Sequence, residues 1–412
     1  MQYGCIGEHL THSFSKIIHG ELASYDYELR EIPMGELDAF MTAREFKAIN
    51  VTMPYKQDVM SHLKEVEATA AAIGAVNTIV NRDGRLFGYN TDFGGMVALI
   101  RRSGIEMASK KVLILGSGGT SHTAVAVARH LGAGEVYRVS RTGKGGALTY
   151  EEVKSAHLDA QVLINTTPRG MFSREGGMAV DPAMFPSLAG AVDAVYNPLR
   201  SAFILAARKK GARAVGALYM LVAQAVLASE IFLGAPYPEG TIERIYRKIK
   251  SGKENIVLTG MPGSGKSTVG KLLSEKLGRP YFDVDACITE KTGRTPAELI
   301  EAEGEAAFRD IESEVIRSLA METGAVIATG GGAVLREENV DALRMNGKLF
   351  FLDRPVELLY PTADRPLSST REAILERYNE RYSRYVATAD FVIANGGTPQ
   401  QASALVERNF LT

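Results

Sequence analysis

A glycine-rich loop with the spacing of a phosphate-binding site stands in the second half of the chain. Residues 260–268 read GMPGSGKST and match the pattern Gly-x-x-x-x-Gly-Lys-Ser/Thr. They follow the apolar run 255–260, an expected strand, and precede an expected helix over 268–277. In this context backbone N–H groups hold phosphate oxygens, Lys266 reaches the β- and γ-phosphates and the Ser267 hydroxyl binds Mg²⁺. The sequence therefore predicts an ATP-type site formed by Gly263, Ser264, Gly265, Lys266, Ser267 and Thr268.

Charged residues and glycines that could serve a phosphoryl acceptor follow this loop. Asp283 and Asp285 end an expected strand, and a period of two would point both carboxylates the same way. The later motifs are Gly304-Glu305-x-x-Phe308-Arg309, the triple glycine 330–332, Asp364-Arg365-Pro366-Leu367 and Arg381-x-x-x-Tyr385-x-x-x-Ala389-Asp390. Each arginine alone would be interpreted as half of a surface ion pair. Together and in this order, the motifs indicate a kinase.

This set resembles the shikimate kinases over about residues 254–412. The resemblance implies that Asp283 holds Mg²⁺ through water and that Asp285 orients the shikimate 3-hydroxyl or accepts its proton. It also implies that Arg309 and Arg381 clamp the shikimate carboxylate, which suits the forked guanidinium group. The N–H groups that would approach the same substrate belong to Gly331 and Gly332.

The resemblance further places a lid over the transferring phosphoryl group. Arg365 of the Arg-Pro-Leu motif would neutralise the charge that develops there. The family usually carries another arginine several residues earlier, and the segment 359–365 has none. We therefore expect a short lid and a modest turnover.

A second glycine-rich turn lies in the first half of the chain, between an expected strand over 112–115 and an expected helix over 120–131. This is the context of a dinucleotide-binding turn, although Ser121 stands where a third glycine or alanine is usual. The next expected strand, 135–140, ends in Ser-Arg-Thr, and the cation Arg141 suits the 2′-phosphate of NADP better than the ribose of NAD. An exposed arginine at a strand end is the alternative. The residues expected at this cofactor are Gly116, Ser117, Gly118, Gly119, Thr120, Ser140, Arg141 and Thr142.

Isolated polar residues in apolar settings recur over the first hundred residues. They are Ser13 and Ser15, the segment 50–56, Asn77-Thr78 and the segment 88–92. Such residues either satisfy local loops or line a pocket for a polyhydroxylated ligand. The residues alone leave both interpretations open.

The first part of the chain resembles the shikimate dehydrogenases over about residues 1–236. The motifs that match are His12-Ser13-Phe14-Ser15, 50–56, 74–78, 88–92, the glycine turn, 140–142, 164–171, 193–198 and Gly216-x-x-x-Met220-Leu221-x-x-Gln224. The resemblance implies that Lys56 and Asp92 form the catalytic pair beside the reacting carbonyl of 3-dehydroshikimate, and that Gly216 lies at the cofactor. It gives the ring hydroxyls and carboxylate to Ser13, Ser15, Thr52, Asn77, Asp92, Tyr196 and Gln224. Lys16 and Phe232 replace a frequent proline and tryptophan.

Together these features predict an α/β fold: a two-lobed dehydrogenase with a Rossmann-like NADP domain, followed by a P-loop kinase domain with a parallel sheet. A chain of 412 residues has room for two or three domains. Further expected elements are strands over 3–6, 47–53, 75–81, 159–166, 190–196, 348–352 and 390–394, and helices over 58–73 and 92–102. The expected boundaries are 1–104 for the substrate lobe, 105–215 for the NADP domain, 216–236 for a helix packing back on that lobe, 237–254 for a linker and 255–412 for the kinase domain.

Net charge, hydropathy and cysteine content indicate which kinds of partner and compartment to expect. The formal net charge of −1 does not favour a nucleic-acid binder, and the apolar stretch 216–235 contains Gln224 and Glu230, which favours a buried helix over a membrane span. Two distant cysteines and no visible secretion signal indicate a cytoplasmic protein, and a homo-oligomer is possible.

The expected function is that of a bifunctional enzyme of aromatic amino acid (chorismate) biosynthesis. It would reduce 3-dehydroshikimate to shikimate with NADPH and then phosphorylate shikimate with ATP and Mg²⁺. One alternative is a weakly active or regulatory shikimate-binding fusion. The other is a quinate/shikimate dehydrogenase with NAD and a slow kinase half.

Overall fold

The computed structural model describes residues 1–10, 14–22, 25–172, 177–360 and 370–411. The chain forms two compact units, Met1–Lys248 and Ile249–Thr412. The boundary between them lies inside α9 (Thr241–Lys253), within the segment expected to be a linker. The five segments expected from the sequence, with their bounds, stay a prediction.

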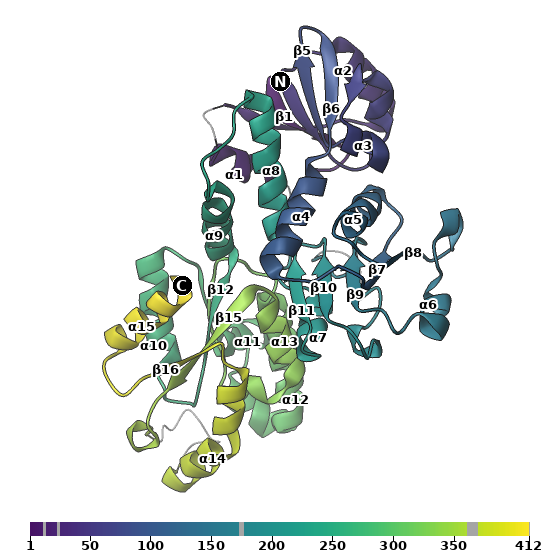
Figure 1. Ribbon diagram of the computed structural model, residues 1–412. Coiled ribbons are helices and arrows are strands. Elements are labelled where there is room, and N and C mark those ends of the chain that lie inside the picture. Colours follow the sequence, from purple (N-terminus) through teal and green to yellow (C-terminus); the bar gives the residue numbers. More distant parts are fainter. Residues whose placement is uncertain (11–13, 23–24, 173–176, 361–369, 412) are drawn as a thin grey trace. The chain divides into compact units, whose positions relative to one another are not determined.

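The first unit begins with a six-stranded mixed sheet (Figure 1). Its order is β2-β1-β3-β5-β6-β4, with β1 parallel to β2 and β3, and with β5 antiparallel to β3 and β6. The strands are β1 (Tyr3–Gly7), β2 (Tyr27–Glu31), β3 (Ala48–Val51), β4 (Glu65–Val66), β5 (Thr78–Arg82) and β6 (Arg85–Tyr89). The short helices are α1 (Ser15–Gly20), η1 (Met34–Glu36), α2 (Leu37–Ala43), η2 (Asp58–His62) and α3 (Ala68–Ile73).

One expectation for this lobe is wrong. A single helix was expected over 58–73, but the chain forms η2, then β4, then α3. The backbone N–H of Lys64 donates to the carbonyl of Leu86, and that of Glu67 donates to the carbonyl of Gly88. Pairing with β6 therefore overrides the helix propensity of this stretch.

Two helices connect this lobe to the next sheet. They are α4 (Thr91–Ser103), which ends at Gly104 as expected, and α8 (Leu218–Leu233), the apolar stretch expected to be a buried helix. They pack closely at Gly95, where a β-carbon would lie 2.8 Å from the Met220 carbonyl oxygen. Glycine at this position therefore allows the two backbones to approach. Among the described residues, no helix has the length and apolar character needed to cross a membrane.

The second sheet is fully parallel, in the order β11-β10-β9-β7-β8. Val112 and Ile114 of β7 pack against α4 and α5, whereas Leu113 and Leu115 pack on the opposite face with α6 and α7. Burial of both faces explains why these strands are continuous apolar runs. The strands are β7 (Lys111–Leu115), β8 (Glu135–Val139), β9 (Val162–Asn165), β10 (Gly190–Asp193) and β11 (Arg213–Gly216). The helices are α5 (Gly119–His130), η3 (Lys144–Gly146), α6 (Tyr150–Ala156), η4 (Pro182–Met184) and α7 (Ala202–Lys209).

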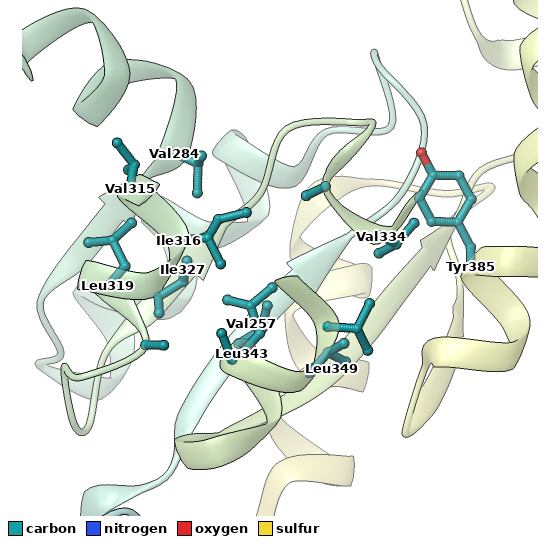
Figure 2. Packing of buried hydrophobic residues seen from close by; sticks show 14 of the residues in the cluster. Val257, Val284, Val315, Ile316, Leu319, Ile327, Val334, Leu343, Leu349 and Tyr385 are labelled. Atoms are coloured by element: carbon teal, nitrogen blue, oxygen red, sulfur yellow. The ribbon is translucent and has the colours of Figure 1, made fainter. Parts of the chain in front are cut away.

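The second unit is built on another parallel sheet, in the order β13-β14-β12-β15-β16. Figure 2 shows Val315, Ile316 and Leu319 of α12 gathered over Ile327 of β14. The strands are β12 (Asn255–Thr259), β13 (Tyr281–Asp283), β14 (Val326–Ala328), β15 (Gly347–Asp353) and β16 (Phe391–Ala394). The helices are α10 (Lys266–Leu277), α11 (Val284–Thr292), α12 (Pro296–Leu319), η5 (Ala333–Leu335), α13 (Glu337–Asn346), η6 (Val356–Leu358), α14 (Arg371–Thr388) and α15 (Pro399–Leu411).

The close packing of α4 on α8 makes a testable prediction. The substitution Gly95→Ala should destabilise the first unit by about 1–3 kcal/mol, because its β-carbon meets the backbone of α8. Gly94→Ala is the matched control: its β-carbon would meet only the terminal methyl of Leu227, a flexible side chain that can move aside. Thermal unfolding of the full chain measures both, and equal losses of stability in the two variants would contradict this packing argument.

Candidate active sites

An ion pair stands at the centre of the first unit. Lys56 Nζ donates to Asp92 Oδ2 over 2.6 Å, and the side chains are 16% and 11% exposed. Lys56 follows the turn after β3, and Asp92 lies in the first turn of α4, where the helix dipole favours a carboxylate. A β-carbon at Gly119 would lie 4.0 Å from Lys56 Cδ. The pair therefore lies against the glycine-rich turn at the start of α5.

A buried amide fixes the start of α4. Asn77 Oδ1 accepts from the backbone N–H of Thr91 over 2.8 Å, and Asn77 Nδ2 donates to Thr91 Oγ1 over 3.0 Å. Asn90 caps the helix by accepting from the N–H of Phe93 over 3.2 Å. These bonds orient the residue next in the chain, Asp92.

The other expected substrate residues lie on several elements of the first unit. Ser15 begins α1 and hydrogen-bonds Tyr27. The ring of Tyr196 meets that of Phe14 edge-on, with centroids 5.3 Å apart, and burial raises the pKa of Tyr196. Gln224 lies on α8 against Gly95 of α4.

The two remaining expected substrate residues are Thr52 and Ser13. Thr52 lies beside Gly7, where a β-carbon would come within 2.6 Å of the Thr52 methyl group. Ser13 lies outside the described residues.

The glycine-rich turn has the geometry expected from the sequence. Gly116 has a φ of +123°, and a β-carbon there would lie 2.5 Å from Thr166 Oγ1. No heavy atom lies within 4 Å of a β-carbon built at Gly118, which leaves its side of the turn open. Ser121 Oγ donates to the Gly118 carbonyl over 2.7 Å. The unusual serine therefore braces the turn, and Ser117 and Thr120 belong to the same loop and helix start.

The end of β8 carries the second half of the expected cofactor site. Ser140 Oγ accepts from the Gly143 N–H over 3.1 Å, and Arg141 and Thr142 are exposed. Burial raises the pKa of Tyr150, and the charges of Arg169 and Arg141 oppose that shift. Two guanidinium groups therefore lie near one tyrosine beside the strand ends. On the opposite side of the sheet, at the end of β11, a β-carbon at Gly216 would lie 2.8 Å from the Leu199 carbonyl oxygen, so glycine is required there.

A buried carboxyl group supports the strand ends of the second sheet. Asp193 is fully buried and accepts from Asn165 Nδ2 over 2.9 Å, from the Val195 N–H over 3.0 Å and from the Ser201 hydroxyl. Burial raises the pKa of Asp193 to about 6, against the opposing effect of these hydrogen bonds. Sequence reasoning did not single out this residue as functional, and its role is to hold the loops that follow β9 and β10.

In the second unit, the phosphate loop connects β12 to α10. Gly263 and Gly265 have φ values of +81° and +86°, which favour glycine. The helix begins at Lys266, two residues earlier than expected, and Lys266 Nζ donates to the Gly260 and Met261 carbonyls over 2.9 and 3.0 Å. The hydroxyl oxygen of Ser264 is buried without a hydrogen-bond partner. The loop therefore holds the Lys266 cation at the start of α10, where phosphate oxygens would bind.

The loop lines a cavity of roughly 800 Å³. Its lining includes Thr268, Asp283, Asp285, Phe308, Arg309, Glu312, the triple glycine 330–332, Arg377 and Arg381. Arg365 lies outside the described residues, as does most of the short lid segment.

The expected placement of the two aspartates on one strand is wrong. Asp283 ends β13 and caps α11, accepting from the Asp285 N–H over 3.1 Å, whereas Asp285 lies in the first turn of α11. The sequence pattern missed that a capping aspartate begins the helix directly after the strand. Both carboxylates still line the cavity, and Ser267 Oγ donates to Asp283 Oδ2 over 2.7 Å.

A cluster of charges closes the other end of the cavity. Arg309 donates to Glu312 over 2.7 Å and to Glu305 over 2.9 Å, and Glu312 is fully buried. Burial lowers the pKa of Arg309, but the two carboxylates raise it. The net shift is upward. Arg381 Nη1 donates to the Gly331 carbonyl over 3.4 Å.

The triple glycine gives this cluster room. A β-carbon at Gly332 would clash with the guanidinium group of Arg309, and one at Gly331 would lie 2.7 Å from Pro262 Cδ. A β-carbon at Gly330 would lie 2.6 Å from Glu312 Oε1 and 3.0 Å from Asp285 Oδ1. Glycine at all three positions therefore keeps the acceptor end of the cavity open.

Comparison with known proteins matches each half to a separate family. The family model for the shikimate dehydrogenase substrate-binding domain matches residues 5–79, and the model for shikimate kinase matches residues 262–410. The NADP⁺ shikimate dehydrogenase of Clostridium beijerinckii is 34% identical over 56% of this chain and 91% of that protein. The shikimate kinase of Clostridium botulinum is 43% identical over 35% of this chain and 90% of that protein. The chain belongs to the shikimate dehydrogenases and to the shikimate kinases.

Solved structures agree for the dehydrogenase half. A chorismate mutase/shikimate 5-dehydrogenase fusion from Clostridium acetobutylicum matches 60% of this chain and 96% of that chain, with a TM-score of 0.56 and 33% identity. The Thermus thermophilus shikimate 5-dehydrogenase, solved with NADP(H) and shikimate, matches 60% of this chain and 99% of that chain, with a TM-score of 0.53 and 29% identity. The expected recognition and α/β fold class are thereby confirmed.

Some residues of the kinase half were not identified as functional from the sequence. Glu312 follows Arg309 by three residues on α12, so helical spacing could have shown that the two share a face. Arg377 precedes Arg381 by four residues on α14 and could have been found in the same way.

The buried Asp193 makes a pH prediction for the dehydrogenase half. Its folded pKa of about 6 exceeds its ordinary value of 3.8, so its protonated form favours the fold, and this contribution is lost as pH rises through about 6. The loss is at most about 3 kcal/mol. Amide hydrogen exchange in β9 and β10, corrected for intrinsic rates, should show this loss in the unsubstituted chain and not in Asp193→Asn. The same pH dependence in both proteins would contradict the assignment.

Proposed function

We propose that the chain is a bifunctional enzyme that reduces 3-dehydroshikimate to shikimate with NADPH and phosphorylates shikimate to shikimate 3-phosphate with ATP. The observation that carries the proposal is the Lys56–Asp92 ion pair against Gly119 of the nucleotide turn. It places a proton donor next to the loop where a dinucleotide binds in this fold. The product of this site is the acceptor for the kinase half.

In the dehydrogenase half, Lys56 and Asp92 form the catalytic pair. NADPH, when bound, supplies the hydride that reduces the ring carbonyl. The Lys56 ammonium group donates a proton to the carbonyl oxygen or stabilises its negative charge as it forms. Asp92, held by the cap of α4, orients Lys56 through their hydrogen bond. Ser13, Ser15, Thr52, Asn77, Tyr196 and Gln224 are the residues proposed to hold the ring hydroxyls and carboxylate.

The cofactor site of this half suits a dinucleotide with a 2′-phosphate. The turn Gly116, Ser117, Gly118, Gly119 and Thr120 offers backbone N–H groups and a helix start to the pyrophosphate. Arg141 follows β8 with Ser140 and Thr142, and no acidic residue stands at 140–142 to favour the unphosphorylated ribose. Gly216, at the end of β11, is also proposed to lie at the cofactor. These features support NADP rather than NAD.

In the kinase half, Lys266 and the phosphate loop hold the nucleotide. ATP supplies the γ-phosphoryl group, and Mg²⁺ neutralises its charge. Ser267 and Asp283, joined by a hydrogen bond, are the proposed magnesium ligands, with Asp283 acting through water. The backbone N–H groups of the phosphate loop, whose residues line the cavity, fit phosphate oxygens.

The acceptor is held at the opposite end of the same cavity. Asp285 orients the 3-hydroxyl of shikimate or accepts its proton. Arg309 and Arg381, with the N–H groups of Gly331 and Gly332, bind the carboxylate. Arg365, of the lid, is proposed to stabilise the transferring group.

The chemical groups do not favour a regulatory protein that has lost catalysis. Lys56, Asp92, Lys266 and Asp285 all keep reactive side chains in clustered positions. The quinate alternative with NAD is opposed by Arg141 at the end of β8. We also propose that the enzyme works in the cytoplasm, because it uses NADPH and ATP and both of its cysteines, Cys5 and Cys287, are free thiols. The expected homo-oligomer and the lack of nucleic-acid and membrane partners stay predictions.

The two activities should respond to separate substitutions. Lys56→Ala should lower NADP⁺-dependent oxidation of shikimate about 10²- to 10⁴-fold, because it removes the proton donor, and should leave ATP consumption with shikimate intact. Lys266→Ala should do the reverse. Lys64→Ala and Lys271→Ala, both exposed lysines, are the controls in the same two halves. Loss of both activities in either single variant would disprove the two-site proposal.

A further inference from the structure

The cavity of the kinase half contains a third guanidinium group besides the two that belong to the family motifs. Arg377 lines the same cavity as Arg309 and Arg381. It precedes Arg381 by four residues on α14, so the two side chains share one face of the helix.

Two carboxylates at this end of the cavity are paired with one arginine. Glu312 and Glu305 both pair with Arg309, and within the described part of the chain neither forms an ion pair with Arg377 or Arg381. Arg309 therefore already has two carboxylate partners before an acceptor binds.

The neighbouring arginines, Arg377 and Arg381, differ from Arg309 because some of their donors have no partner in the described part of the chain. Nε and Nη1 of Arg377 and Nε of Arg381 are buried and have no hydrogen-bond partner among the residues that the structure describes. Burial and then the charge of Arg381 lower the pKa of Arg377, while Glu305 opposes this shift. Two like charges with unpaired donors at one cavity wall are costly unless an anion joins them.

We propose that Arg377 is a substrate-binding residue that holds the carboxylate of the acceptor together with Arg381. The inference rests on the proposed kinase function and extends it, because Arg377 becomes a specificity-determining group for acidic polyol acceptors. Arg309, which is paired with two glutamates, then helps to orient the acceptor more than to balance the charge of its carboxylate.

The test compares variants of the full chain in ADP formation with shikimate and Mg-ATP, without NADP⁺. Arg377→Gln should raise the KM for shikimate about 10- to 100-fold, with little change in kcat or in the KM for ATP. Arg377→Lys, which keeps the charge, should recover part of the affinity. Arg317→Gln, an exposed arginine on α12, is the matched control and should have no effect.

The variant Glu305→Gln separates direct contact from an indirect role. If Arg377 binds the substrate, Arg377→Gln should raise the KM equally with or without Glu305→Gln. An effect that disappears in the Glu305→Gln background would mean that Arg377 acts through Glu305 and would overturn the proposal, as would an unchanged KM. Folding of the kinase unit in each variant is checked by a normal KM for ATP. Failure of the unsubstituted chain to phosphorylate shikimate would instead refute the proposed kinase function itself.

Discussion

Parallel strand pairing is the constraint on which both sites depend. When neighbouring strands run the same way, their carboxyl ends meet at one edge, and the loops that follow them meet there too. The second and third sheets are parallel throughout, so short motifs far apart in the sequence converge at those edges. The residues delivered in this way are Gly116, Ser140, Asn165, Asp193, Gly260, Asp283 and Gly330. The mixed first sheet adds Lys56 after β3, and the helix α4 supplies its partner.

Each candidate site contains an ion pair that is largely removed from water. Lys56–Asp92 and Arg309–Glu312 are largely buried pairs, and burial of an ion pair seldom adds stability by itself. Each pair holds a cation in one orientation, which fits the substrate-binding roles that we propose for Lys56 and Arg309. The fully buried Glu312 is unusual, because one of its oxygens has no hydrogen-bond partner, and burial raises its pKa despite the adjacent Arg309.

The sequence predicted those features that are encoded locally. The glycine turn and the phosphate loop each combine a strand, a turn and a helix within about a dozen residues, and both have the expected geometry. Segment 58–73 was mispredicted because its hydrogen bonds go to β6, a distant partner that periodicity cannot reveal. Asp285 was misplaced because the chain turns directly from strand to helix at Asp283. Arg377 was overlooked because its significance lies in unpaired donors, which only the packed cavity shows.

The central claim is that one chain carries two working sites in consecutive steps. The most direct measurement supplies the purified protein with 3-dehydroshikimate, NADPH and Mg-ATP, and follows the products by phosphorus NMR and mass spectrometry. We expect shikimate 3-phosphate, with NADPH and ATP consumed in equal amounts once shikimate reaches a steady level. Accumulation of shikimate without phosphorylated product, or no consumption of NADPH, would contradict it.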